Sequence, residues 1–155
     1  MSTSGSGNGW EVLAKAALQA AGIHVRTQED LGPTLRLPGR KAIRIDLLVP
    51  PNQLQRHPGG LAVSVKGQSV DGSADEKLWF HLDRVIPATL FPVLLVMPGS
   101  AWHEDWIQEA KDKMDGIQLI AVLTSIDELY EWALSVVKEG ITKEYAFYQA
   151  MYAVT

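Results

Sequence analysis

The sequence predicts an α/β fold in which helices flank a mixed central sheet, and three observations support this. Apolar residues recur at helical spacing over residues 10–21 and 125–138. Apolar residues alternate with small or polar ones over residues 61–66, which is typical of a strand. Predominantly apolar runs at 91–97 and 117–123 are the pattern of buried parallel strands.

The first part of the chain is expected to contain a helix, a short strand and a loop. The helix covers residues 10–21, and Gly22 provides its stop. A short strand is expected at residues 23–27. Residues 28–39 are rich in glycine and proline and read as a loop with room for a brief strand.

Two strands and a helix are expected next. The strands cover residues 43–49 and 61–66, and residues 50–60 connect them. This connection is too long and too rich in proline for a tight turn, and it could reach across a substrate groove. Residues 73–85 form the next predicted helix.

The remaining elements alternate between strands and helices. The strand at 91–97 is followed by a helix at 101–114, and the strand at 117–123 by a long amphipathic helix at 125–138. The complete predicted order is therefore αβββαβαβα.

One folded domain is expected, with a short segment at each end. Residues 1–9 read as a flexible leader and residues 10–138 as the domain. Residues 139–155 are rich in aromatic side chains. They are expected to pack either on the domain or on a second copy of the chain.

The composition bounds the class of protein. The chain has 155 residues, of which 46% are hydrophobic and 21% charged, and these are values for a globular domain. It contains no cysteine, which fits a reducing cytoplasm and excludes thiolate metal sites. No apolar run approaches the roughly 20 residues of a membrane span. The sequence therefore predicts a cytoplasmic protein with no membrane association.

Four polar residues on the two adjacent predicted strands form a candidate motif. Asp46 lies on the first strand, and Ser64, Lys66 and Gln68 lie at or just after the end of the second. Side chains two positions apart on a strand share a face, so Ser64, Lys66 and Gln68 are expected to point the same way. Pairing of the two strands would bring Asp46 close to Ser64 and Lys66.

This pattern resembles the PD-(D/E)XK nuclease superfamily, in which an Asp precedes a hairpin and the sequence (Asp/Glu)-x-Lys, often followed by x-Gln. The resemblance covers roughly residues 10 to 135 and implies a restriction-endonuclease-like αβββαβ core, extended here by a further strand and helix. It also implies Mg²⁺-dependent hydrolysis of DNA, with Mn²⁺ as a substitute and no nucleotide cofactor. Small members that cut both strands commonly act as homodimers.

The chain departs from the family pattern at Ser64, where the second acidic residue should stand. A neutral hydroxyl is a poor ligand for a divalent ion that prefers anionic oxygens. Three explanations remain open. Glu76, ten residues after Lys66, supplies the missing carboxylate from the next helix. Alternatively, Ser64 disables the site, by natural loss or by deliberate replacement. Thirdly, Asp46, a backbone carbonyl and water hold the metal alone.

The resemblance implies a role for each of these residues. Asp46 would hold Mg²⁺, Lys66 would orient the attacking water and stabilise negative charge, and Gln68 would position groups through its neutral amide. Glu11, on the first helix, would complete the metal environment through water. Each has an ordinary alternative: Asp46 as a turn or capping residue, Lys66 as a surface lysine and Glu11 as a carboxylate favoured at a helix start.

Glu76 has a particularly strong structural alternative. It stands three residues after Ser73, and Ser-x-x-Glu is a capping box at a helix N-terminus. Ser125 and Glu128 repeat the pattern where no active site is expected. A carboxylate in the first turn can nevertheless cap a helix and still face a cleft.

Contacts to DNA are expected from basic residues. Lys77, His81 and Arg84 follow Glu76 at helical spacing, and Arg44 belongs to a group of basic residues early in the chain. A solvated helix face explains the same spacing. The net charge of −4 argues against a broad electrostatic coating of nucleic acid but is compatible with one basic cleft.

The sequence thus predicts a metal-dependent DNA endonuclease of restriction, homing or junction-resolving type. The first alternative is a catalytically disabled nuclease fold that binds DNA or a protein partner. A second is an unrelated α/β interaction domain. An enzyme requires Asp46, Lys66 and one further carboxylate to lie near a common point. A disabled relative would keep the strands in place but turn Glu76 away, and an unrelated domain would place Asp46 and Lys66 on opposite faces or far apart.

Overall fold

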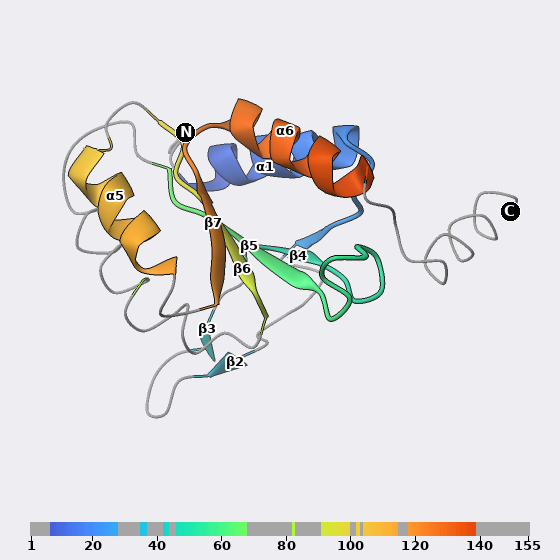
Figure 1. Cartoon of the computed structure of the whole chain (residues 1–155). Helices are drawn as coiled ribbons and strands as arrows, with labels where there is room; N and C mark the ends of the chain where they lie inside the picture. Colours follow the sequence, from blue (N-terminus) through green and yellow to red (C-terminus); the bar gives the residue numbers. More distant parts are fainter. Residues whose placement is uncertain are drawn as a thin grey trace, which may run out of the picture.

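The computed structural model describes residues 7–27, 35–36, 42–43, 46–67, 82, 91–99, 102, 104–114 and 118–138. Its helices and strands are labelled in Figure 1. They follow in the order α1 (Gly7–Ala20), β1 (Arg26–Thr27), β2 (Leu35–Arg36), β3 (Ala42–Ile43), β4 (Leu47–Val49), β5 (Leu61–Val65), β6 (Val93–Val96), α5 (Glu104–Asp112), β7 (Leu119–Leu123) and α6 (Ile126–Lys138).

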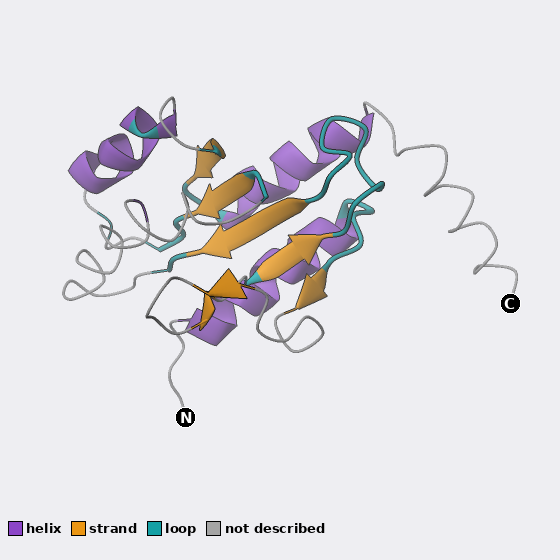
Figure 2. Ribbon diagram, turned by 90° about the horizontal axis from the view of Figure 1, so that it is seen from below, coloured by secondary structure: helices purple, strands orange, loops and turns teal. Residues whose placement is uncertain are grey.

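Five strands form one open sheet in the order β1-β4-β5-β6-β7. The pairs β1–β4 and β4–β5 are antiparallel, whereas β5–β6 and β6–β7 are parallel. Strands β2 and β3 form a separate antiparallel pair. Figure 2 shows the strands of the large sheet lying across two of the helices. The predicted α/β class with a mixed sheet is therefore confirmed.

Different helices cover the two faces of this sheet. Successive side chains of a strand point to opposite faces. Accordingly, Val63 and Val65 of β5 belong to a core layer that includes residues of α1 and α6, whereas Ala62 belongs to a layer that includes residues of α5. We call these the α1/α6 layer and the α5 layer. Figure 1 shows α1 and α6 side by side, with α5 apart from them.

Both parallel connections contribute a buried residue to the α5 layer. Helix α5 joins β6 to β7, and its Ala110 is fully buried in that layer. Leu82 lies between β5 and β6 in sequence and is buried in the same layer with 1% of its surface exposed. Two successive right-handed crossovers that move in one direction along a sheet cover the same face, so the two connections agree with this rule.

The predicted strand over residues 43–49 is wrong as one continuous element. Ile43 ends β3, which pairs with β2, and β4 begins only at Leu47. Asp46 stands directly before β4, where its carboxylate accepts the backbone N–H of Val65 at 2.8 Å. The Asp46 side chain therefore accepts an N–H that a backbone carbonyl accepts in a regular pair of strands. Apolar alternation along the sequence gives no sign of this replacement.

The other described elements agree with the predictions in type and differ at their ends. The helices expected at 10–21, 101–114 and 125–138 correspond to α1, α5 and α6, and the strands expected at 91–97 and 117–123 to the shorter β6 and β7. Strand β5 ends one residue before the predicted limit.

Two short strands also bear on the predictions. The strand expected at 23–27 is reduced to Arg26–Thr27, since Ile23 and Val25 are buried without strand pairing. The predicted loop at 28–39 contains the brief strand β2.

Several predictions fall outside the described residues. They concern residues 1–6 of the leader, the C-terminal segment 139–155 and, apart from Leu82, the helix at 73–85. Helix α1 begins at Gly7, three residues before the predicted start. Among the helices that the structure describes, none is both long and apolar enough to cross a membrane.

The connection between β4 and β5 is attached to the rest of the domain by Gln53, whose side chain is fully buried. Its amide oxygen accepts the backbone N–H of His24 at 2.5 Å, and its amide nitrogen donates to the carbonyl of His24 at 2.7 Å. The side chain thus pairs with His24 as a neighbouring strand would. One amide joins the segment before β1 to the connection.

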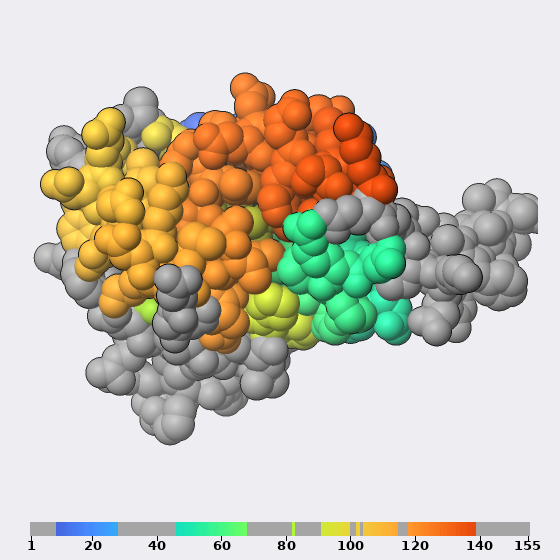
Figure 3. All heavy atoms as spheres, in the orientation of Figure 1, coloured from blue at the N-terminus to red at the C-terminus, as the bar shows by residue number. Residues whose placement is uncertain are grey.

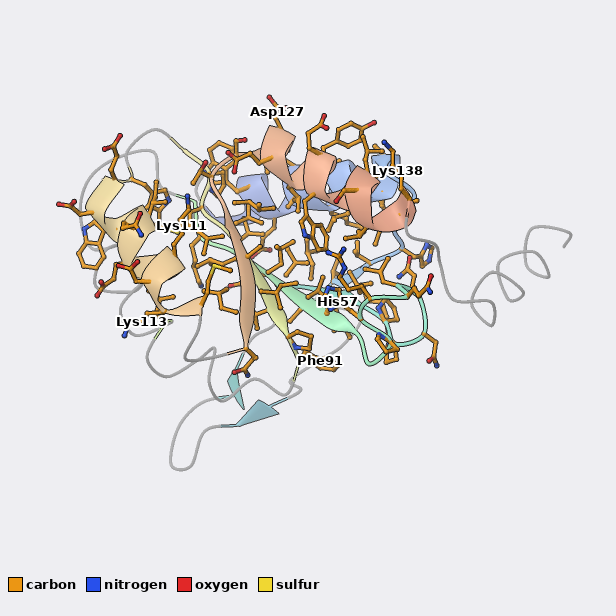
Figure 4. All side chains as sticks on the ribbon, in the orientation of Figure 1. His57, Phe91, Lys111, Lys113, Asp127 and Lys138 are labelled. Atoms are coloured by element: carbon orange, nitrogen blue, oxygen red, sulfur yellow. The ribbon has the colours of Figure 1, made fainter. Side chains whose placement is uncertain are left out.

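Gly60 ends this connection in a conformation that favours glycine, with φ at 102°. A Cβ there would lie 3.1 Å from the carbonyl oxygen of Val49 and 3.2 Å from the ring of Phe91. Phe91, labelled in Figure 4, therefore packs against the start of β5. The connection enters β5 through a close backbone approach.

Replacement of Gln53 by alanine is expected to lower the free energy of unfolding by about 1–3 kcal/mol, because it leaves the N–H and C=O of His24 without their partner. Urea denaturation measures this loss. Gln55 in the same connection is exposed, so Gln55→Ala should change the stability by less than about 0.5 kcal/mol. Equal effects of the two substitutions would contradict a specific role for Gln53.

Candidate active site

Asp46 lies at the start of β4 and contacts the end of β5. Its side chain is buried, with 9% of its surface exposed, and Oδ2 accepts the N–H of Val65. The register pairs Leu47 with Val63, so Asp46 stands one step further along towards Ser64. Asp46 therefore contacts Val65, the residue between Ser64 and Lys66, to which strand pairing was expected to bring it close.

The pairing of β5 explains why Val65 needs a side-chain acceptor. The N–H groups of Ala62 and Lys66 donate to carbonyls on the β6 side, those of Pro92 and Val96. Because N–H groups alternate in direction along a strand, that of Val65 faces β4. Continued register would pair Val65 with residue 45, which precedes the first residue of β4. The Asp46 carboxylate accepts this N–H in place of a backbone carbonyl.

Ser64 occupies a buried position on the central strand. It is 8% exposed and pairs with Leu95 of β6. Residues that pair in a sheet share a face, and Leu95 belongs to the α5 layer. The hydroxyl of Ser64 therefore lies on the side of the sheet that α5 covers, and a bulkier group at this position would have to find room in that layer.

Lys66 follows β5 and is partly exposed. Its N–H donates to the carbonyl of Val96 at 2.8 Å, so the pairing with β6 continues one residue beyond the end of β5. This continued pairing favours the predicted common face of Ser64 and Lys66. The carbonyl of Lys66 accepts the indole N–H of Trp102 at 2.9 Å.

Gly67 packs directly against the indole of Trp10, which lies on the other face of the sheet from Trp102. A Cβ built on Gly67 would lie 1.9 Å from Cδ1 and 2.4 Å from Nε1 of Trp10, distances at which no carbon atom fits. Trp10 packs at the edge of the α1/α6 layer, whereas Trp102 belongs to the α5 layer. Two tryptophans from opposite faces of the sheet therefore enclose residues 66–67.

Sequence reasoning missed the contact of Trp102 with Lys66 and that of Trp10 with Gly67. One signal was present in the sequence. Glycine directly after Lys66 interrupts a strand-like run, and an isolated glycine at such a place often marks a close approach by another group. Nothing in the sequence identifies that group as Trp10.

Glu11 is the helix neighbour of a residue that contacts the end of β5. It lies on α1, is partly buried and follows Trp10, whose indole contacts Gly67. The first turns of α1 therefore lie against the end of β5. A metal-linked role of Glu11 stays a prediction.

The remaining predicted site residues lie outside the part of the chain that the structure describes. These are Gln68, Glu76, Lys77, His81, Arg84 and Arg44. Within the described ranges, no group of three or more His, Asp or Glu side chains is arranged to hold a metal ion. Of the predicted acidic ligands, Asp46 and Glu11 lie within the described residues, and metal binding by either of them stays a prediction.

The second Ser-x-x-Glu sequence shows what this pattern does in the chain. The backbone N–H of Glu128 donates to Oγ of Ser125 at 3.0 Å, as in a capping box. The Glu128 carboxylate reaches back to Thr124, accepting its N–H at 2.9 Å and its hydroxyl at 3.0 Å. The capping prediction for residues 125–128 is confirmed, and the same alternative stays open for Glu76.

The Figure 3 view presents α5, β7 and α6 next to one another, with part of the connection between β4 and β5 beside them. Basic side chains of α5 and of the turn after it, Lys111 and Lys113, lie at one end of this view, and Lys138 of α6 at the other (Figure 4). These three lysines are therefore dispersed in this view.

Gly67→Ala is expected to lower the free energy of unfolding by about 1–3 kcal/mol, because the added methyl group must displace the Trp10 indole. The matched control is Gly59, around which a Cβ meets nothing within 4 Å. Gly59→Ala should leave stability unchanged or raise it by less than about 1 kcal/mol. Thermal or urea denaturation compares the two variants, and equal stability would refute the close packing of Trp10 on Gly67.

No protein-family model matches the chain, and comparisons with curated proteins and with solved structures found no match either. The candidate site therefore rests on the residues that meet at the start of β4 and the end of β5.

Proposed function

We propose that the chain is a metal-dependent DNA endonuclease with a restriction-endonuclease-like core. The order of elements supports this proposal. A first helix, α1, precedes three strands of the large sheet, β1, β4 and β5, and the chain then crosses over to β6, which is parallel to β5. This is the order that the αβββαβ core implies, if residues 73–85 supply its second helix.

The observation that carries the proposal is the contact between Asp46 and the end of β5. The Asp46 carboxylate accepts the N–H of Val65, the residue between Ser64 and Lys66. Asp46, Ser64 and Lys66 therefore lie within one short stretch of two adjacent strands. An unrelated domain was expected to place Asp46 and Lys66 far apart, so their proximity at the end of β5 favours the nuclease proposal.

Asp46 is the residue that would hold Mg²⁺. A carboxylate offers two oxygens with about four lone-pair sites, so acceptance of one N–H is compatible with metal ligation. Ser64 contributes a neutral hydroxyl, which is a weak ligand for such an ion. We propose that Glu76 supplies the second carboxylate and that Glu11 acts through water. The bound ion would supply Lewis-acid polarisation of the scissile phosphate.

Lys66 would act on the water and on the developing charge. It follows β5 on the face expected for Ser64, and its ammonium group can orient a water molecule and stabilise negative charge on the phosphate. Gln68 would position a phosphate or a water through its amide. The backbone of Lys66 is held on both sides, which favours a fixed direction for its side chain.

The proposed partner is DNA, contacted by Lys77, His81, Arg84 and Arg44. Because the chain carries a net charge of −4, the attraction must come from a local basic cleft rather than from the whole surface. A homodimer would place two such sites on opposite strands of a duplex. A cytoplasmic location is part of the same proposal.

A second candidate is a disabled nuclease fold that binds DNA or a protein partner. Two features favour it: Ser64 is neutral and buried, with 8% of its surface exposed, and the Asp46 carboxylate already serves the backbone of β5. In this case Asp46 is retained because it completes the sheet. Cleavage assays on matched variants separate the two candidates.

The first test is cleavage of plasmid and branched DNA with Mg²⁺ or Mn²⁺ by the unsubstituted chain and by Lys66→Ala. We expect cleavage by the unsubstituted chain and a loss of at least about 100-fold in the alanine variant, since the charge of Lys66 stabilises the transition state. Glu76→Gln should also be inactive if Glu76 supplies the displaced carboxylate.

Two further variants at Ser64 identify a disabled site. Ser64→Glu restores the family carboxylate, and Ser64→Gln provides a neutral side chain of the same size. Cleavage by the glutamate variant alone would show that the second candidate is correct. Inactivity of the unsubstituted chain and both variants with metal, while all of them remain folded, would argue against nuclease function.

Asp46→Asn separates the structural and catalytic roles of the carboxylate. The amide oxygen of asparagine can still accept the Val65 N–H, so we expect stability within about 1 kcal/mol of the parent. The loss of charge should abolish metal-dependent cleavage. Asp46→Ala removes both functions and should be less stable by about 1–3 kcal/mol. Full cleavage by the asparagine variant would exclude Asp46 as the metal ligand.

A further inference from the structure

Trp102 completes the hydrogen bonding of β5 at the residue that bears the proposed catalytic ammonium group. It lies between β6 and α5, is 7% exposed, and donates its indole N–H to the carbonyl of Lys66 at 2.9 Å. We propose that Trp102 is a positioning residue for Lys66, which fixes the direction of the Lys66 side chain through this hydrogen bond. The inference rests on the proposed function.

The register of the sheet explains why an indole is needed. Ala62 pairs with Val93 and donates to the preceding carbonyl, that of Pro92, and Lys66 donates to Val96 in the same way. The pattern of a parallel ladder therefore assigns the carbonyl of Lys66 to the N–H of residue 98. Residue 98 is proline, which has no N–H. The Trp102 indole supplies the donor that Pro98 lacks.

Hydrogen bonds at both the N–H and the carbonyl of Lys66 fix the direction of its side chain. The N–H of Lys66 belongs to one planar peptide unit and its carbonyl to the next. The bond to Val96 orients the first plane and the bond from Trp102 orients the second. With both planes set, φ and ψ of Lys66 are set, and so is the direction of its Cα–Cβ bond. Gly67 and Trp10 restrict the chain immediately after it.

Trp102→Phe removes the donor and keeps an aromatic ring in the α5 layer. The test is single-turnover cleavage, measured in whichever background cuts, the unsubstituted chain or Ser64→Glu. We expect the rate constant to fall by about 10- to 100-fold, as misplacement of a catalytic group by about 1 Å predicts. The amplitude of the single-turnover reaction should change by less than about twofold, and so should the dissociation constant for DNA measured with Ca²⁺. A loss of folded protein would instead lower the amplitude.

Two variants make the test specific. Trp132→Phe, on α6 in the other core layer, controls for replacement of a packed indole and should cleave at the parent rate. Pro98→Ala restores a backbone N–H at residue 98, which can donate to the Lys66 carbonyl. The double variant Trp102→Phe/Pro98→Ala should therefore recover much of the lost rate, which a purely packing role of Trp102 would not allow.

The outcomes distinguish the inference from the proposed function. If Lys66→Ala is inactive and Trp102→Phe cleaves at the parent rate, the positioning role is wrong and the nuclease proposal stands. If no background cleaves, the nuclease proposal fails, and ¹³C relaxation at the Lys66 side chain tests the positioning directly. Greater mobility of the Lys66 Cβ in Trp102→Phe, reversed by Pro98→Ala, is the expected result, and unchanged mobility would overturn the inference.

Discussion

The constraint on which this domain depends is the central position of β5. All five of its residues are buried, and it is paired on one edge with antiparallel β4 and on the other with parallel β6. A strand in this position must have every N–H and C=O paired, because water cannot reach them. The two core layers are built on its alternating side chains, so α1 and α6 are held on one face and α5 on the other. The candidate site lies where this central strand ends.

At that end of β5, side chains on both neighbouring sides form hydrogen bonds with its backbone. On the β4 side, the carboxylate of Asp46 accepts the N–H of Val65. On the β6 side, Pro98 has no N–H, and the indole of Trp102 donates to Lys66. A buried polar group without a partner costs roughly 1–3 kcal/mol, so both replacements contribute to the stability of the sheet. Asp46 is also the proposed metal ligand, and Trp102 contacts the backbone of the proposed catalytic Lys66, so the side chains that complete the sheet are linked to the proposed chemistry.

The sequence predicted those parts of the fold that depend on local pattern. The apolar runs that became β6 and β7 are continuous because both faces of these strands are covered, and β5 alternates where Ser64 interrupts Val63 and Val65. The break before β4 was not predictable, because Ile43 and Leu47 continue an apolar alternation across it. The contact between Trp102 and Lys66 joins residues 36 positions apart. It depends on strand register, which no local pattern reveals, and the same is true of Trp10 and Gly67.

The enclosure of residues 66–67 by two indoles gives the chain an intrinsic optical probe. Of its five tryptophans, Trp10 and Trp102 touch this segment from opposite sides of the sheet. Indole emission responds to the polarity and to the hydrogen bonding of the ring. Any ligand that changes the surroundings of these two indoles at the end of β5 therefore changes the fluorescence of the unlabelled protein. Replacing Trp10 or Trp102, one at a time, assigns the signal to one core layer or the other. Occupancy of this region can thus be followed without a chemical reaction.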